Sequence, residues 1–227
     1  MNLGRLMYIG FIPLLLLWSP VLIRGEEAQG ELIEARIPPD TDFAKILNKP
    51  AIIKTEVSSE VGDAHTRWIG MLADIQVCTD IPQDVLRRVV TDYEQYPRIF
   101  KRLTSIKVNR ASEGVYQDWH IRVGFKNFSF DTDYTLLAVE QINTQDKYLL
   151  DFSHVSDDGS VKDAWGIWYF ENIHLDGAER TYVRYTTSCK TLRKFPLQRV
   201  IMGIIINMEY TDLMNQFLQA ARRASGS

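Results

Sequence analysis

Apolar and polar residues alternate along most of the chain, in short stretches separated by turn-forming residues. Between residues 115 and 123, Trp119 and Ile121 share one face of an extended chain, whereas Asp118 and His120 share the other. This period of two is typical of a β-strand with one buried face. The same pattern, or enrichment in β-branched residues, predicts strands over residues 50–57, 65–77, 103–110, 115–123, 128–138, 147–154, 164–173 and 181–189.

Two short helices are expected between the second and third of these strands. Pro82 suits the first position of a helix, where its missing N–H costs nothing. Four apolar residues behind it are spaced as on one face of a helix, namely Val85, Leu86, Val89 and Val90. Thr91 and Glu94 have the spacing of a capping box, which predicts the second short helix. Pro97 then redirects the chain.

Near the C-terminus the period changes to that of an α-helix, from Pro196 to about Ala224. Residues 200–208 are apolar on nearly every side, yet they are far fewer than the roughly 20 that cross a bilayer. A helix that is apolar all round is a buried helix. We therefore expect an α+β fold in which a curved antiparallel sheet of about seven strands wraps around a long C-terminal helix.

The N-terminal residues have the composition of a targeting segment. Arg5 precedes an apolar run over residues 6–23, and Ala28 and Gly30 are small residues placed as in a signal-peptidase site. We expect a secretory signal peptide over residues 1–30, and hence a periplasmic or secreted protein. The alternative is a chain anchored by an uncleaved N-terminal helix. Residues 31–66 are expected to form a linker and a lead-in hairpin strand, and residues 67–225 the ligand-binding domain.

Charge and cysteine content narrow the function. The 26 basic and 29 acidic residues leave a net charge of −3, whereas nucleic-acid binding needs a basic stripe, so no nucleic-acid partner is expected. An exported chain with Cys78 and Cys189 invites a disulfide. However, both cysteines end strands that we expect to pair antiparallel, which places them roughly ten residues apart along the sheet. We therefore expect both thiols to be free.

The order of elements resembles the START-like (SRPBCC) superfamily, in its polyketide cyclase/dehydrase or coenzyme Q-binding START branch. The residues that carry the resemblance are Pro82, Val85, Val89, Asp92, Tyr93, Tyr96, Pro97, Phe100, Gly166, Trp168, Thr181, Val183, Tyr185 and Pro196. The resemblance implies a helix-grip fold whose cavity holds a lipid, quinone or polyketide-like molecule. Some members are enzymes, but their catalytic residues differ between branches, so none is carried over to this chain.

The candidate ligand-binding residues lie where strand parity, the cavity mouth or the gripped helix would place them. They are Tyr93, Tyr96, Phe100, Trp119, Phe128, Phe130, Tyr134, Phe152, His154, Trp168, Phe170, Tyr185, Ile204 and Met208. Cavities of this kind are apolar with a few polar groups, which Gln117, Thr132 and Thr187 supply by parity. The aromatic set is also what an ordinary core requires. Tyr93, Tyr96 and Phe100 either gate the cavity or wedge the short helices against the sheet.

Other chemistry is sparse. The four histidines are too scattered for a metal site, and Asp131 and Asp133 fall on the face expected to meet solvent. No catalytic residue and no cofactor is predicted. Arg98, Lys101 and Arg102 could meet anionic headgroups in a transient membrane contact, although three charges are ordinary for a solvated surface. The favoured function is an exported carrier of a hydrophobic ligand, and the alternatives are a cyclase or dehydratase and an interaction module with a closed pocket.

Overall fold

One antiparallel sheet of eight strands forms the body of the protein, in the order β1-β2-β8-β7-β6-β5-β4-β3. The computed structural model describes residues 36–62, 66–125, 128–157, 159–193 and 198–226, without the side chains of residues 123–125, 128–130 and 205. The strands are β1 (Ala51–Val61), β2 (Arg67–Thr79), β3 (Leu103–Ala111), β4 (Gly114–Phe125), β5 (Phe128–Asn143), β6 (Lys147–Asp157), β7 (Val161–Leu175) and β8 (Ala178–Leu192).

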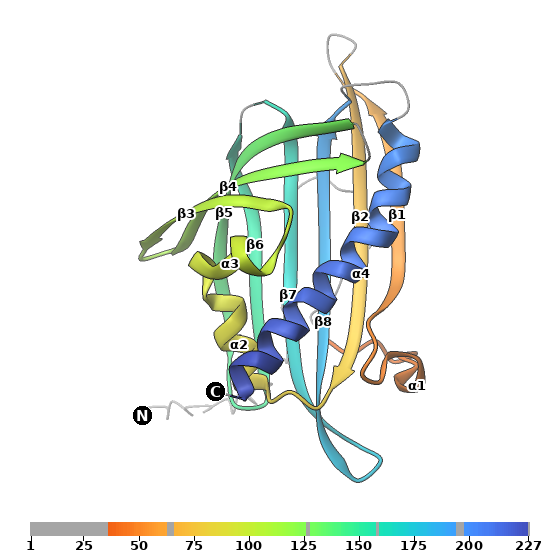
Figure 1. Cartoon of the computed structure of the whole chain (residues 1–227), viewed down its shortest axis with the longest axis vertical. Helices are drawn as coiled ribbons and strands as arrows, with labels where there is room; N and C mark the ends of the chain where they lie inside the picture. The colour runs from red at the N-terminus through yellow and green to blue at the C-terminus, as the bar shows by residue number, and fades with distance from the viewer. Residues whose placement is uncertain (1–35, 63–65, 126–127, 158, 194–197, 227) are drawn as a thin grey trace, which may run out of the picture.

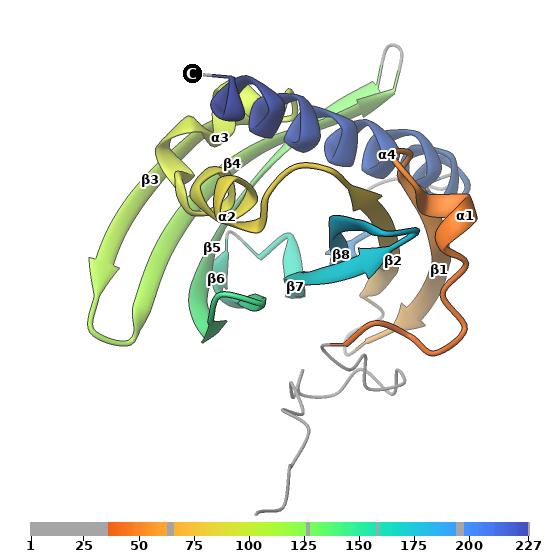
Figure 2. The same ribbon diagram turned by 90° about the horizontal axis from the view of Figure 1, so that it is seen from below.

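The helices lie mostly on the concave face of this sheet. α4 crosses that face diagonally, and the sheet curls around it with α2 and α3 alongside (Figures 1 and 2). The helical elements are α1 (Phe43–Ile46), α2 (Gln83–Thr91), the 3-10 turn η2 (Tyr93–Gln95), α3 (Tyr96–Ile99) and α4 (Gln198–Ser225). Within the described part of the chain, no helix combines the length and the apolarity that a membrane crossing requires.

This architecture confirms the predicted helix-grip fold and corrects the strand count. The eighth strand is β1, which pairs with β2 over its full length and therefore belongs to the same sheet. β2 pairs antiparallel with β8, which places Cys78 opposite Tyr182 and Cys189 opposite Met71. Both cysteines are free, as expected. The predicted signal peptide, residues 1–30, lies outside the described residues.

Two local predictions at the short helices were wrong. The predicted capping box is not formed, because the Thr91 hydroxyl donates to the Arg87 carbonyl and the Glu94 carboxylate accepts from Arg110. Pro82 stands one position before the helix rather than inside it. The capping-box side chains find partners outside the local motif, which spacing alone does not reveal. The difference at Pro82 is a shift of one position at the helix start.

The lead-in segment is more than a linker, because it covers the convex face of the sheet. Ile46 is buried in a second apolar cluster with Tyr169 and Tyr182, and the Asn48 N–H donates to the Cys78 carbonyl. Nearby, two nitrogens of Arg184 donate to the Asp74 carboxylate, at 3.0 and 2.7 Å. The central strands are thus buried on both faces, as is usual only where a second layer covers the sheet.

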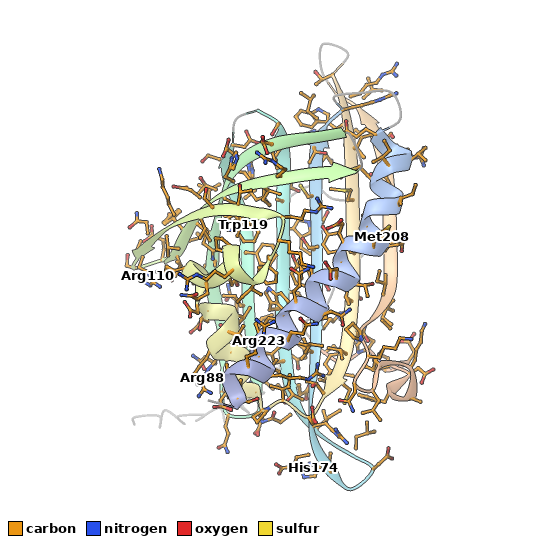
Figure 3. The ribbon with its side chains drawn as sticks, viewed as in Figure 1. Arg88, Arg110, Trp119, His174, Met208 and Arg223 are labelled. Atoms are coloured by element: carbon orange, nitrogen blue, oxygen red, sulfur yellow. The ribbon has the colours of Figure 1, made fainter. Side chains whose placement is uncertain are left out.

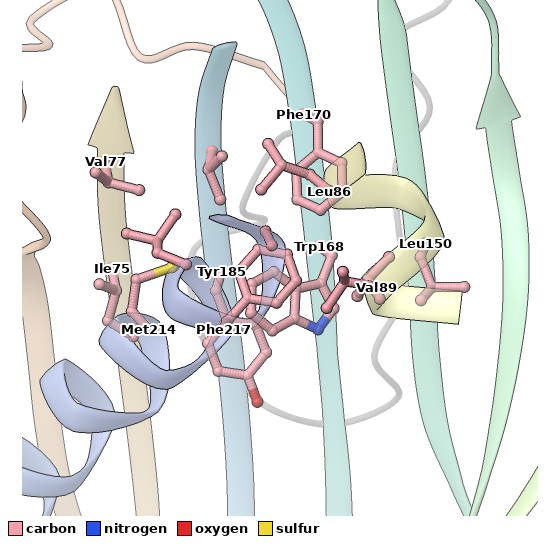
Figure 4. Packing of buried hydrophobic residues seen from close by; sticks show 14 of the residues in the cluster. Ile75, Val77, Leu86, Val89, Leu150, Trp168, Phe170, Tyr185, Met214 and Phe217 are labelled. Carbon is pink, nitrogen blue, oxygen red and sulfur yellow. The ribbon is translucent and has the colours of Figure 1, made fainter. Parts of the chain in front are cut away.

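The principal core fills the space between the sheet and the C-terminal half of α4 (Figure 4). The Phe217 ring of α4 lies 4.6 Å from the Trp168 ring and 6.1 Å from the Phe170 ring. Leu86 and Val89 bring α2 into the same cluster. Aromatic burial of this size contributes several kcal/mol in total (roughly 1.5–3 per side chain), so this end of α4 is firmly held.

The N-terminal half of α4 is less enclosed than its sequence predicts. Val200, Ile204 and Met208 are 62, 44 and 60% exposed, and they follow one another at intervals of four along one face (Figure 3 labels Met208). Met202 and Ile206 face inward instead. The all-apolar stretch is therefore gripped on one side only, and this corrects the expectation that residues 200–208 are fully buried.

The Tyr96 side chain wedges the short helices against the sheet. It is 4% exposed, its ring packs edge-on against Phe100 and Trp119, and its hydroxyl donates to the Val90 carbonyl at 2.6 Å. That carbonyl belongs to the last turn of α2, whose oxygens lack partners within the helix. A gate residue that is free to move would have neither this burial nor this bond, so the wedge interpretation is favoured.

We expect Tyr96→Ala to lower the free energy of unfolding by about 3–5 kcal/mol, because a large buried ring is removed. Tyr96→Phe keeps the ring and should cost about 1 kcal/mol for the lost hydrogen bond. Urea denaturation of both variants measures these losses. A stable Tyr96→Ala protein with altered ligand uptake would instead establish the gate.

Candidate ligand-binding cavity

A cavity of about 190 Å³ lies between the sheet and α4, with its helical wall running from Met202 to Gln216. The cavity follows from a gradient of side-chain size along β7 and β8. At one end Trp168 faces Tyr185, and these rings reach α4. Toward the other end the facing pairs become small: Gly166 with Thr187, Ala164 with Cys189, and Val161 with Thr191. Interiors are otherwise packed at crystal density, so this succession of small side chains is what leaves space under the helix.

Gly166 determines where the Phe152 ring lies. The two residues are cross-strand partners, and a Cβ on Gly166 would lie 2.3 Å from the Phe152 ring. Because glycine has no side chain, the ring crosses β7 and stacks on Tyr185, with the centroids 6.2 Å apart. Phe152 and Tyr185 therefore form the partition between the main cavity and a smaller one.

The smaller cavity, of about 30 Å³, is enclosed by the wedge residues and by Gln117, whose amide oxygen accepts from the Trp119 indole N–H at 2.9 Å. A single water needs roughly 10–15 Å³ of such space. This cavity is therefore suited to one or two waters and is too small for a hydrophobic ligand.

Ion pairs join the two sides of the cavity rim. Arg102, in the turn between α3 and β3, donates through Nε to Glu209 of α4 at 2.8 Å and through Nη2 to the other carboxylate oxygen. Beside it, the Lys101 ammonium lies 3.5 Å from Asp212, and the Lys101 backbone N–H donates to the Gln216 side chain. Lys101, Arg102, Glu209 and Gln216 all line the cavity. These contacts tie α4 to the α3–β3 turn at the partly exposed rim of the cavity.

The interior of the cavity is uncharged at neutral pH. Burial raises the pKa of the Tyr185 phenol to about 12 and that of the Cys189 thiol to about 12. Burial also holds the pKa values of Tyr134 and Tyr210 well above their ordinary range. These groups keep their protons because the charged form would lose its hydration.

The structure divides the predicted site residues among several places. Phe100, Tyr134, Phe152 and Tyr185 line the main cavity. Others line the smaller cavity, namely Tyr93, Tyr96, Trp119 and Trp168. Phe170 is a core residue stacked on Tyr148 and Phe217. Phe128 and Phe130 lie outside the residues whose side chains are described.

Like Phe170, three further predicted residues lie away from both cavities. Ile204 and Met208 are on the exposed face of α4, because the rotation of the helix turns Met202, Ile206 and Tyr210 inward instead. His154 is mostly buried, with its Nε2 atom 3.4 Å from the Asp157 carboxylate, and does not belong to the described lining. Strand parity was correct for its neighbours but did not reveal this local pairing.

Several lining residues were missed by the sequence interpretation: Met71, Ile121, Cys189, Thr191, Met202, Ile206, Tyr210 and Leu213. Cys189 and Thr191 share the parity of Tyr185 and Thr187, so extending that alternation to the end of β8 would have found them. The helical residues required the rotation of α4 about its axis, which depends on packing.

Asp131 and Asp133, which the sequence places on the solvent face of the sheet, lie on the outer surface of the protein. Arg122 binds Asp131 and the His120 ring binds Asp133, at 2.8 and 2.7 Å. These pairs are solvent-exposed, which agrees with a surface role. In the part of the chain that the structure describes, no cluster of three metal-ligating side chains is present, and His65 lies outside that part.

The sequence model of the family described as "Polyketide cyclase / dehydrase and lipid transport" matches residues 79–218. The chain belongs to this family. The match begins at the end of β2 and reaches Leu218 in α4, so it includes the wedge residues, the rim and nearly all of the cavity wall. No curated protein sequence matches the chain.

Solved structures that align with this chain share little of its sequence. TTHA0849 from Thermus thermophilus aligns with a TM-score of 0.50 at 14% identity, covering 68% of this chain and 99% of that chain. The Zhui aromatase/cyclase from Streptomyces sp. R1128 gives 0.48 at 17%, covering 68% and 94%. A STAR-related lipid transfer protein from Xanthomonas axonopodis gives 0.49 at 12%, covering 72% and 98%. At such identities likeness concerns the fold alone.

The buried phenols and thiol predict a loss of stability in alkali. The pKa of Cys189 rises from 9.0 to about 12 and that of Tyr185 from 10.0 to about 12, so the native state holds these protons more tightly than the unfolded chain. Stability should be full below about pH 9 and should fall as pH rises from there to about 12. Urea titrations between pH 7 and 11 measure the slope, which Cys189→Ser should reduce. Constant stability up to pH 11 would contradict the burial of these groups.

The rim ion pair predicts a kinetic effect. Glu209→Gln removes the charge that Arg102 binds and should accelerate exchange of a bound apolar probe by up to about fivefold, since partly exposed pairs contribute about 0.2–1 kcal/mol. Stopped-flow fluorescence measures the rate. Glu94→Gln is the matched control, because it breaks the exposed Arg110 pair, which lies away from the rim. Equal rates in both variants would show that the rim does not limit entry.

Proposed function

We propose that this protein is an exported binding or carrier protein that holds a hydrophobic molecule, such as a lipid, quinone or polyketide-like compound, between the sheet and α4. The observation that supports this most is the largely apolar cavity of about 190 Å³ between the sheet and α4. An apolar cavity of about 150 Å³ already suffices to bind benzene in a protein. The family description, which names lipid transport beside cyclase and dehydrase activity, is consistent with this proposal.

The composition of the wall suits an apolar ligand. Met71, Ile121 and Leu136 from the sheet face Met202 and Ile206 from the helix. Burial of ligand surface against such side chains yields about 25 cal/mol per Å². The charged groups of the described lining are confined to the rim, where they are paired. A ligand therefore gains affinity from its hydrocarbon part and enters past the Arg102–Glu209 pair.

The alternative function, a cyclase or dehydratase, requires an acid and a base aimed into the cavity. Among the described lining residues, Tyr134, Tyr185, Tyr210 and Cys189 keep their protons at neutral pH, and Glu209 is bound by Arg102. General acid–base catalysis works best with groups whose pKa lies near the working pH. The contents of this cavity therefore favour binding over catalysis. An interaction module with a closed pocket is disfavoured by the open volume.

The proposed export rests on residues 1–30, whose basic start, apolar run and small residues have the pattern of a signal peptide. The wall chemistry does not distinguish a lipid from a quinone. A mass spectrum of the organic extract of the purified protein would identify what it carries.

Filling the cavity should weaken ligand binding without unfolding the protein. Ala164 is 5% exposed and lines the cavity beside Cys189, so Ala164→Phe places a ring in the open space. We expect at least tenfold weaker binding of an uncharged fluorescent probe, which corresponds to about 1.4 kcal/mol, with the unfolding temperature preserved.

Val155→Phe is the control for this substitution. Val155 is 48% exposed on β6, so the variant adds a similar ring outside the cavity. Fluorescence titration and thermal unfolding of both variants separate occupancy from misfolding. Unchanged probe binding in a folded Ala164→Phe protein would show that the cavity is not the binding site.

A further inference from the structure

The main cavity and the smaller cavity touch the same four side chains. Phe100, Phe152, Tyr185 and Leu213 belong to the described lining of both. Phe100 follows α3, Phe152 is on β6, Tyr185 is on β8 and Leu213 is on α4. The two spaces, of about 190 and 30 Å³, are therefore divided by side chains from four elements. Removal of one suitable side chain would join them.

Phe152 is the member of this group whose position depends on an absent side chain. A Cβ on its cross-strand partner Gly166 would lie 2.3 Å from the Phe152 ring and 2.5 Å from the Thr186 carbonyl oxygen. The ring therefore lies over the glycine backbone, where any other residue would displace it. It is partly buried and packs against two separate apolar clusters, as expected of a ring that stands between two compartments.

Two other members of the group hold the fold together. The Tyr185 ring lies 4.3 Å from the Trp168 ring, in the aromatic cluster that grips α4. The Phe100 ring lies 5.0 Å from that of Tyr96, the wedge of the short helices. Replacing either would disturb the support of a helix. Phe152 is on a strand inside the sheet, so its ring can be shortened while these supports remain in place.

The space behind Phe152 suits the end of a hydrocarbon chain. The described lining of the smaller cavity includes no charged residue, and Ala138 and Leu150 are part of it. Burial raises the pKa of the Tyr93 phenol to about 12 and holds that of Tyr96 well above its ordinary range, so both stay uncharged. The Gln117 amide oxygen is bonded to the Trp119 indole. A chain that reached this space would meet no charge.

The main cavity by itself has room for a compact ligand only. A cavity of about 150 Å³ holds benzene, which has six carbons. On that scale the 190 Å³ of the main cavity corresponds to roughly eight carbons. A longer chain would have to extend past the partly exposed rim at Arg102 and Glu209. Hydrocarbon that stays in water contributes no affinity, so length beyond this limit brings no gain.

We propose that Phe152 sets the upper size limit of the ligand, because its ring closes the smaller cavity off from the main one. The protein then carries a compact apolar molecule, or a chain of about eight carbons, in preference to a long-chain lipid. This inference rests on the proposed function and narrows it to a size class of ligand.

The test is a series of uncharged 1-alkanols, from butanol to dodecanol, titrated by calorimetry into the purified, delipidated protein and into Phe152→Ala. Each alkanol is used below its solubility limit. The informative quantity is the dissociation constant of octanol divided by that of dodecanol in the same protein. This ratio reports how far the chain is enclosed, and a general weakening of the fold changes both constants alike.

In the wild type, affinity should increase about fourfold per methylene group up to octanol and then level off, which gives a ratio close to one. Phe152→Ala removes six ring carbons, so its limit should lie about four to six carbons higher, since interiors fill space at one density. The octanol-to-dodecanol ratio should therefore be at least tenfold larger in Phe152→Ala than in the wild type.

Two further variants separate a partition from general loosening. Leu150→Ala enlarges the smaller cavity from behind and leaves the Phe152 ring in place, so its ratio should equal that of the wild type. Phe152→Leu keeps a side chain of intermediate size and should give an intermediate ratio. It also provides the measurement if the alanine variant does not fold.

Three results would overturn the size limit and leave the carrier function intact. The first is a wild type whose affinity keeps increasing through dodecanol, which requires no variant. The second is a wild-type ratio in the folded Phe152 variants. The third is an equal increase of the ratio in Leu150→Ala and Phe152→Ala. Failure of every alkanol to bind any of these proteins overturns the proposed function itself.

Discussion

The packing of α4 against two central strands is the constraint on which the rest of the structure depends. Trp168 lies 4.3 Å from Tyr185 and 4.6 Å from Phe217, ring centroid to ring centroid. These rings hold the C-terminal half of the helix at a distance set by their size. Further along the same strands Ala164 and Cys189 are too small to reach a helix held at that distance. Because a helix is stiff, the aromatic contacts at one end create the space at the other.

The burial of the sheet on both faces makes this arrangement possible in a single domain. The lead-in segment and α1 cover the convex side, where Ile46 and Tyr182 pack together. The Arg184–Asp74 pair is buried there with its hydrogen bonds made, so its desolvation is compensated. The concave face can therefore contain an unfilled space under α4 while the central strands remain well covered. The cavity lies on the side that is less completely filled.

The fold could be predicted from the sequence to a large extent, and the site only in part. The alternation of residues 115–123 and the helical period after Pro196 specify local structure, and turn pairs such as Asp176–Gly177 join consecutive strands into hairpins. Tyr134, Phe152 and Tyr185 followed from strand parity, and Phe100 from the expected position of the cavity mouth. Ile204 and Met208 did not fit, since an apolar stretch does not indicate which of its faces meets the sheet. Tyr96 looked equally suited to gate and wedge until its burial and its bond to Val90 were visible.

What the sequence determined by itself is the set of elements and the family, because period, turn chemistry and the residues from Pro82 to Phe100 are local properties. What only the tertiary structure decided is which inward side chains meet and which leave a gap. The cavity depends on the strand register that places Ala164 opposite Cys189 and on the rotation that turns Met202 inward. The partition formed by Phe152 depends on the register that places it opposite Gly166. Such relations join residues far apart in the chain, and no local pattern encodes them.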